Sequence, residues 1–375
     1  MLSDFVRRPE AKTRSFVSPS GAGNLLGCGL RTAYDSESAA GKSRIGSPAT
    51  RLGTACHNVL ELAAKGDFPE PAAPEWGDHF NASWVKAIEH EVEELRSLPG
   101  AGSWPEPERW PFYARRKAAT KRVARKLCLE LADSAIEALA EVPLETSDGL
   151  IRGRPDLVIR APVHEIRDYK TGAVIEPATG DIRPEYLMQL LLYAVLEHAS
   201  TGEWPSSGLL VPLEGHEVAV DLDPAEAGSL ENTVKESLAA YNRVAESGGD
   251  PLQLARPSPE ACRYCDHATE CPAFWEAVNP EWEAGGVHAA AGVVTGVRVA
   301  ARGSIAVDLD RVVGSVGSGP LSLTGIDLVE FPGASQIEVS GTLAAVGLYS
   351  KQEGYAEPSR GTRLGVWPPV PGEPA

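Results

Sequence analysis

One stretch, GRPDLVIRAPVHEIRDYKTG, places the firmest constraint on the fold, and it spans residues 153–172. Apolar and polar residues alternate before and after Ala161-Pro162, and this period of two is typical of β-strands. Proline is common in the turn between two strands. The stretch therefore predicts a β-hairpin with Asp156 at its start and Asp168 near its end.

Helical patterns flank this hairpin on both sides. Apolar residues three and four apart predict helices, which we place at residues 51–66, 76–98, 113–141, 183–199 and 224–246. Further strands are expected at residues 142–146, 208–213 and 216–222. This mixture predicts an α/β unit in which a mixed sheet is flanked by helices.

The chain changes character at about residue 285. From there to residue 375 it is rich in glycine and carries short runs of valine and leucine, with almost no helical pattern. We therefore expect two domains, residues 1–284 and residues 285–375, and the second is predicted to be a small all-β barrel of the OB or SH3 type.

Composition restricts the location and the partners. No apolar run is long enough to span a membrane, and the first residues lack the apolar core of a secretory signal, so we expect a cytoplasmic protein with no membrane partner. The net charge of −17 opposes binding to nucleic acid, yet residues 111–128 carry seven Lys or Arg and no acid. That basic cluster is either a solvated helix face or a surface that contacts a nucleic-acid backbone.

The hairpin carries a candidate metal site. Residues two apart on a strand point to the same side, so Asp168 and Lys170 project together, and Asp156 on the partner strand is within reach of that side. Two converging carboxylates repel each other unless a divalent cation lies between them, and Mg²⁺ prefers oxygen ligands of this kind. Such a cation polarises a phosphate and activates water, and a neighbouring lysine stabilises developing negative charge. The alternative is a surface hairpin with acidic ends and no chemistry.

Three residues outside the hairpin bear on that choice. His57 lies in RLGTACH on the helix predicted at 51–66, where an imidazole is a possible further metal ligand. Gln189 and Tyr193 lie four residues apart and therefore share one face of the helix predicted at 183–199. Each feature alone is commonplace.

Taken in order, RLGxxxH, GRPD, DYKTG and QxxxY resemble the motifs of the PD-(D/E)XK nuclease superfamily, in its RecB-like exonuclease branch. The resemblance covers about residues 15–275 and implies a restriction-endonuclease-like core. It implies that the metal ligands are His57, Asp156, Asp168 and the backbone carbonyl of Tyr169. It gives Lys170 the task of positioning water, while Gln189 and Tyr193 support the site and the nearby DNA.

The cysteines add a second resemblance. Cys262, Cys265 and Cys271 follow the nuclease-like unit, and Cys28 lies far upstream. One early and three late cysteines resemble the iron–sulfur subgroup of these nucleases, which includes CRISPR-associated exonucleases, and imply a [4Fe–4S] cluster that ties the two ends of the domain together.

Other interpretations of the cysteines stay open. Structural zinc accepts four cysteines equally well, and nearby His267 allows a mixed Cys/His site. Gly29 stands where relatives usually have proline. We interpret Cys56 and Cys128 as buried thiols.

The sequence therefore predicts a Mg²⁺- or Mn²⁺-dependent deoxyribonuclease, an exonuclease acting on single-stranded DNA ends in repair, recombination or defence. The C-terminal domain is expected to bind single strands, a helicase or another protein partner, and cleavage is expected to survive removal of residues beyond about 285. Two alternatives are a catalytically silent DNA-binding subunit of nuclease fold and a zinc-stapled regulatory protein.

Overall fold

The structure is a computed structural model, and it describes residues 6–38, 48–97, 106–132, 135–177, 179–300, 303–317, 319–328 and 330–369. The α-helices are α1 (Pro19–Gly27), α2 (Gly29–Ser38), α3 (Pro48–Ala64), α4 (Trp76–Ser97), α5 (Tyr113–Leu131), α6 (Pro184–Thr201), α7 (Pro224–Glu246), α8 (Pro259–Cys262) and α9 (Pro272–Ala277). The strands are β1 (Glu137–Ala140), β2 (Leu144–Glu145), β3 (Arg152–Gly153), β4 (Leu157–Ala161), β5 (Glu165–Lys170), β6 (Ser207–Pro212), β7 (Val218–Val220), β8 (Ala289–Val299), β9 (Ser304–Gly314), β10 (Leu321–Asp327), β11 (Thr342–Gln352) and β12 (Tyr355–Trp367).

The first part of the chain is a mixed five-stranded sheet in the order β1-β4-β5-β6-β7. The predicted hairpin is confirmed: β4 and β5 pair antiparallel, with Leu157 opposite Arg167 and Ile159 opposite Glu165. Strand β6 runs parallel to β5, and helix α6 makes the connection between them. The site-bearing strand β5 is thus the central strand of the sheet.

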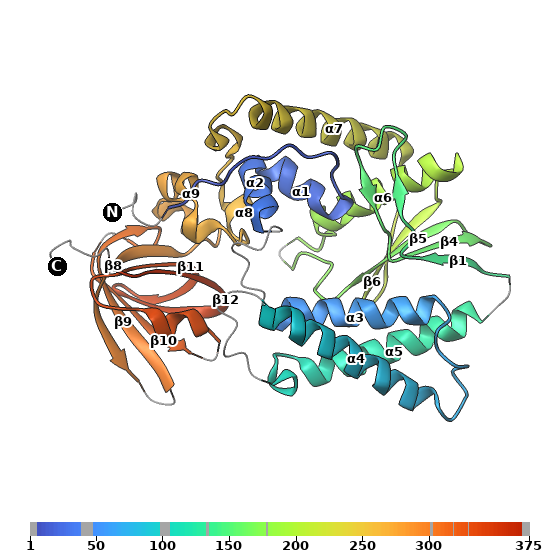
Figure 1. Cartoon of the computed structure of the whole chain (residues 1–375), viewed down its shortest axis with the longest axis horizontal. Helices are drawn as coiled ribbons and strands as arrows, with labels where there is room; N and C mark the ends of the chain where they lie inside the picture. Colours follow the sequence, from blue (N-terminus) through green and yellow to red (C-terminus); the bar gives the residue numbers. More distant parts are fainter. Residues whose placement is uncertain are drawn as a thin grey trace.

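Helices cover both faces of this sheet, as Figure 1 shows, with α3, α4 and α5 on one side and α1, α6 and α7 on the other. Each side has its own core. Leu157 and Tyr169 pack against the α3–α5 side, whereas Ile166 packs against α6 and its neighbours. Because side chains alternate along β5, Asp168 and Lys170 share the side of Ile166 and face α6.

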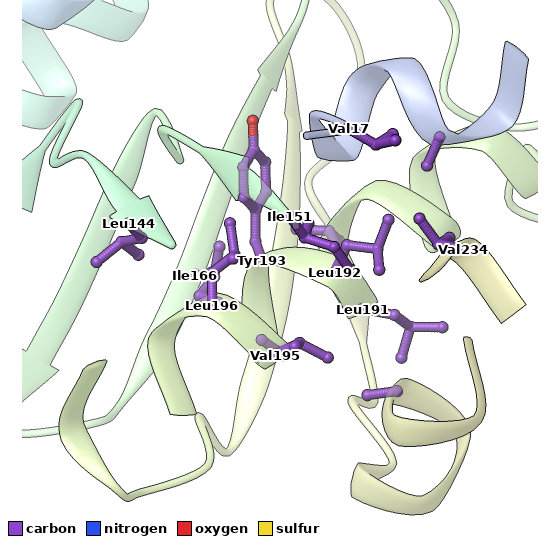
Figure 2. Close-up of a cluster of buried hydrophobic side chains, with 14 of the residues drawn as sticks. Val17, Leu144, Ile151, Ile166, Leu191, Leu192, Tyr193, Val195, Leu196 and Val234 are labelled. Carbon is purple, nitrogen blue, oxygen red and sulfur yellow. The ribbon is translucent and has the colours of Figure 1, made fainter. Parts of the chain in front are cut away.

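The core around α6 is almost entirely aliphatic. Figure 2 shows Leu191, Leu192 and Val195 of α6 beside Ile166 of the sheet, while the hydroxyl of Tyr193 points away from this cluster. Nine successive residues of α6, from Gln189 to Glu197, are buried. A helix that is buried all round holds its side chains in fixed positions, which suits a helix that supports a site.

One predicted element is wrong in its length. The helix expected at residues 113–141 ends at Leu131, and residues 137–140 form the edge strand β1. Ala138 and Leu139 pair with Ile159 and Val158 of β4, so sheet pairing determines the conformation of a segment whose apolar spacing also fits a helix.

The C-terminal part, residues 289–367, is an all-β domain, as the sequence predicts. Its five long strands pair in the circular order β10-β12-β11-β8-β9, and the ring is completed by a parallel contact of only two residue pairs between β10 and β12. Its interior is filled by aliphatic side chains such as Leu323 and Leu343. Its assignment to the OB or SH3 type stays a prediction.

The C-terminal β-domain packs against the cysteine-bearing segment. Ala344 and Val346 of β11 share a buried cluster with Phe274 and Trp275 of α9. The Arg363 guanidinium of β12 also donates a hydrogen bond of 2.7 Å from Nη2 to the Arg263 carbonyl. Figure 1 shows α8 and α9 next to β8 and β11. In the part of the chain that the structure describes, we find no helix with the length and apolarity needed to cross a membrane.

Candidate functional site

Helix α3 and the β4–β5 hairpin bring the predicted ligands His57, Asp156 and Asp168 to the same region. Asp156 lies immediately before β4, and its Oδ1 is 3.3 Å from His57 Nδ1. Its other oxygen, Oδ2, accepts a hydrogen bond of 2.6 Å from the backbone N–H of Tyr169. Asp156 is thereby fixed to the strand that carries Asp168 and to the helix that carries His57.

A chain of polar contacts runs from β5 into helix α6. Lys170 Nζ lies 2.5 Å from Asp168 Oδ2 and donates a hydrogen bond of 2.7 Å to Gln189 Oε1. The amide of Gln189 in turn donates from Nε2 to Tyr193 Oη at 3.2 Å. The sequence predicts that Asp168 and Lys170 lie together and that Gln189 and Tyr193 lie together, and the structure joins the two pairs.

The lysine has an aromatic neighbour that the sequence analysis missed. Lys170 Nζ lies 4.6 Å from the centre of the Tyr186 ring, within the range of a cation–π contact. Tyr186 lies three residues before Gln189 in YLMQ, so the helical spacing would have indicated that both side chains face β5.

The two aspartates differ in their surroundings. Asp168 is only 2% exposed, and burial raises its pKa to about 6; the Lys170 ammonium opposes this rise, and the nearby Asp156 carboxylate adds to it. For His57, burial lowers the pKa, but the hydrogen bond and charge of Asp156 outweigh it, so the pKa is raised. The protonation of Asp168 and of His57 therefore depends on the charges of the neighbouring site residues.

Glu141 is a further carboxylate at the site, and the sequence analysis missed it. It follows β1 with a φ of 51°, a conformation that is unusual for a residue other than glycine. Its N–H lies 3.4 Å from the Asp156 carbonyl oxygen, and its carboxyl group is hydrogen-bonded to that of Asp156. Burial raises the pKa of Glu141 to about 7, and the Asp156 and Glu61 carboxylates add to the rise.

The residues before His57 hold α3 in place. Arg51 Nη1 lies 3.2 Å from Oε2 of the buried Glu91 on α4. At Gly53 an added Cβ would lie 3.3 Å from Thr171 Oγ1, so the lack of a side chain allows α3 to approach the end of β5 closely. The RLG of RLGTACH therefore positions His57 beside the hairpin.

The donor set suits a hard divalent cation, although the ligands are not assembled around one. Among the described residues, no three His, Cys, Asp or Glu side chains come together closely enough to hold a metal ion. Asp168 Oδ2 is nevertheless buried and accepts no hydrogen bond of good geometry, although Lys170 Nζ lies beside it. A buried carboxylate oxygen in this state, next to Asp156 and His57, fits Mg²⁺ or Mn²⁺ in its chemistry.

The four predicted cofactor cysteines line one cavity. Cys28, from the turn between α1 and α2, faces Cys262, Cys265 and Cys271, and all four are free thiols. The backbone N–H of Arg256 points at the Cys28 sulfur at 3.5 Å. Burial raises the pKa values of Cys262 and Cys271 to about 12 and that of Cys265 to about 11. The cysteines therefore line a buried region in which thiolates without a ligated metal are unfavourable.

The other residues of the cysteine analysis have structural contacts. His267 stacks on Tyr34, and its Nε2 and Nδ1 lie 3.0 Å from Asp35 and 3.2 Å from Glu270, so the contacts do not support a mixed Cys/His site. Cys56 is buried, as expected, whereas Cys128 is half-buried.

The basic cluster of α5 is largely engaged within the protein. Arg122 donates a hydrogen bond to the Leu213 carbonyl at 2.8 Å, and Arg125 donates to the Pro71 carbonyl at 3.0 Å. Lys126 and Arg115 form ion pairs with acidic residues of the β6–β7 turn. These contacts favour a structural role for the cluster over a nucleic-acid surface.

Comparison with protein families identifies the chain. A sequence profile of the PD-(D/E)XK nuclease superfamily matches residues 17–272. The chain belongs to that superfamily. The mixed sheet flanked by helices is therefore the core of a PD-(D/E)XK nuclease, with the candidate site on its central hairpin.

Solved structures similar to this PD-(D/E)XK chain include two exonuclease-like proteins. A candidate exonuclease from Eubacterium rectale is 11% identical with a TM-score of 0.37, and the match covers 62% of this chain and 82% of that one. An alkaline exonuclease from Laribacter hongkongensis is 14% identical with a TM-score of 0.26, and the match covers 53% of this chain and 93% of that one. A comparison with curated proteins finds no match.

Proposed function

We propose that this protein is a metal-dependent deoxyribonuclease of the RecB-like type that digests DNA from single-stranded ends. The observation that carries the proposal is the hairpin itself, which holds Lys170 against Asp168 and Asp156 against His57, in a chain of nuclease family. A nuclease that has lost its activity would be expected to lack at least one of these side chains.

The residues divide the work of phosphodiester hydrolysis. Mg²⁺ or Mn²⁺, when bound, polarises the phosphate and lowers the pKa of water. His57, Asp156, Asp168 and the Tyr169 carbonyl are the groups that would hold it. Lys170 positions the attacking water and stabilises negative charge that develops on the phosphate. Gln189 holds the Lys170 ammonium at 2.7 Å and is itself oriented by Tyr193 at 3.2 Å, so these two act by positioning.

We further propose that the four cysteines hold a [4Fe–4S] cluster. They line a common cavity, and four cysteine thiolates are the ligand set that such a cluster needs. Zinc accepts the same four ligands, so the resemblance to the iron–sulfur nucleases is what favours the cluster. None of the six cysteines, which all lie in the described part of the chain, forms a disulfide, which suits a reducing compartment, and we propose the cytoplasm.

The cluster has a direct test. Protein purified without oxygen is expected to be brown and to contain about four irons per chain. Serine at Cys28 or Cys265 should remove the colour, whereas serine at Cys56 should not. A colourless protein with one zinc per chain would show that the zinc alternative is right.

The nuclease activity is tested with end-labelled DNA. We expect single-stranded DNA to be shortened from its end in Mg²⁺ or Mn²⁺, with no products in EDTA, and blunt duplex and RNA to be poorer substrates. Helicase-dependent digestion of duplex would place the protein in repair, recombination or defence. A well-folded, cluster-loaded protein that binds DNA but leaves it intact in both metals would instead be the silent subunit.

A further inference from the structure

Two arginines from distant parts of the chain lie near the four cysteines, one in the lining of their cavity and one beside the turn between Cys262 and Cys265. Arg31 of α2 lines the cavity together with the four cysteines. Arg363 comes from β12 of the C-terminal β-domain, and its Nη2 donates a hydrogen bond of 2.7 Å to the carbonyl of Arg263. Arg263 lies between Cys262 and Cys265, so Arg363 is held at the turn that carries two of the cysteines.

Neither guanidinium is compensated by a close carboxylate. Within the described ranges, the Nε atoms of Arg31 and Arg363 are buried without a hydrogen-bond partner, and neither side chain forms an ion pair with Asp or Glu within 4.0 Å. The largest charge that acts on Arg363 is the Asp266 carboxylate, followed by Cys265, the repelling Arg31 guanidinium and Cys262. Both side chains are partly buried, and two like charges near each other without an ion-pair partner are unfavourable, so the pair favours a negative group close by.

The cavity becomes negative only when its cysteines are ligands. Four protonated thiols are neutral, whereas four thiolates outweigh the positive charge of a [4Fe–4S] core and leave the whole assembly anionic. A zinc ion with four thiolates is anionic for the same reason.

We propose that Arg31 and Arg363 are the counter-charges of an anionic, thiolate-bound group in this cavity, and that the C-terminal β-domain contributes positive charge to it through Arg363, which is held beside the cysteine turn. The inference rests on the proposed cluster. It gives the β-domain a task that its sequence does not reveal: it supplies positive charge to a site formed by the nuclease part of the chain.

The inference predicts a change in the reduction potential of the cluster. Reduction adds an electron to an already anionic group, and a nearby positive charge stabilises the added electron. Arg363→Gln should therefore shift the potential to more negative values, Arg31→Gln should do the same, and the double variant should shift it further. Arg363→Lys, which keeps the charge, should restore most of the wild-type potential.

The matched control is Arg298→Gln, which removes an arginine of the same domain whose side chain is exposed and pairs with Asp308 at 2.7 Å. The potentials are measured by anaerobic redox titration of full-length, cluster-loaded proteins. An unchanged potential in the double variant, with the cluster retained, would overturn the inference.

A second measurement tests the counter-charges whether the cavity holds iron or zinc. The rate of metal release to a chelator can be followed whether the protein carries iron or zinc, and the Arg363→Gln and Arg31→Gln variants should release it several-fold faster than wild type and Arg298→Gln. If wild type carries zinc, the proposed cluster fails while faster release still supports the counter-charges. Equal release rates in all variants, or a wild type that holds neither metal, would contradict the counter-charges as well.

Discussion

At the residue scale, the site is a continuous set of contacts from His57 through the hairpin to helix α6. The sequence predicts its main members, because the period of two on a strand places Asp168 beside Lys170, and the period of a helix places Gln189 beside Tyr193. It does not predict Glu141, whose place depends on a left-handed backbone conformation after β1 and on contact with Asp156. Such a contact between separate strands leaves no periodic signal.

Lys170→Ala separates the positioning of water from metal binding. Lys170 is not a metal ligand, so the variant should lose at least about 100-fold in kcat, as removal of a charge-stabilising group does. Its affinity for Mn²⁺ should stay within a few-fold of wild type. Single-turnover cleavage and calorimetric Mn²⁺ titration measure the two effects. Loss of Mn²⁺ binding along with activity would show that Lys170 holds the site together instead.

Glu141→Gln should change the pH dependence of stability in the metal-free protein. The pKa of Glu141 is raised from 4.5 to about 7 in the folded state, so the folded protein retains a proton that the unfolded chain releases. The resulting stabilisation is fully present below pH 4.5 and is lost as the pH rises through 7. The glutamine variant has no such loss.

The comparison is made by urea unfolding in EDTA at pH 5 and pH 8. The variant should gain stability relative to wild type between the two values. Asp168, which titrates in the same region, is present in both proteins and cancels in the difference. A constant difference across this range would show that Glu141 is not shifted.

At the scale of elements, the sequence predicts the hairpin and the long helices, because amphipathic spacing and alternation are local signals, but it does not predict the shorter helices α1, α2, α8 and α9. The helix predicted from residue 113 to 141 is too long: residues 137–140 carry apolar spacing that also fits a helix, but they pair with β4. The basic cluster on the same helix was open to two interpretations, and contacts with sequence-distant carbonyls such as those of Pro71 and Leu213 decide between them.

Arg125→Gln is expected to destabilise the α3–α5 side of the molecule. Arg125 donates to the Pro71 carbonyl and lies 5.7 Å from the Trp76 ring centre, so its removal should cost about 1–2 kcal/mol. Lys117→Gln, on the same helix, should cost less than about 0.5 kcal/mol, because within the described residues Lys117 makes no hydrogen bond or ion pair. Chemical denaturation measures both. A large loss of DNA affinity in Lys117→Gln would revive the nucleic-acid interpretation of α5.

At the scale of the whole molecule, the β-domain, the cysteine segment and the N-terminal segment form one assembly. The Arg7 N–H donates to the Glu270 carbonyl at 2.8 Å, while β11 packs against α9. The glycine-rich alternation after residue 285 predicts an all-β domain, but it gives no sign of this packing. These contacts join segments that lie far apart in the sequence, so local sequence patterns do not predict them.

Truncation after residue 284 tests that assembly. The sequence alone predicts that cleavage survives, since every proposed catalytic residue precedes residue 200. Ala344 and Val346 pack with Phe274 and Trp275 in one buried cluster. Because truncation removes this packing, the shortened protein should melt at a lower temperature and lose its cofactor faster. Calorimetry and metal analysis measure these effects. Unchanged melting and cofactor content would show that the β-domain is an independent module.

The central claim is that Asp168 helps to hold a catalytic divalent cation, and Asp168→Asn tests it most directly. The substitution removes the ligand charge and keeps the shape, so DNA cleavage in Mg²⁺ or Mn²⁺ should be abolished while DNA binding is retained. Asp181→Asn, an exposed surface change, is the matched control and should cleave like wild type. Cleavage of end-labelled single-stranded DNA by Asp168→Asn at the wild-type rate would contradict the claim.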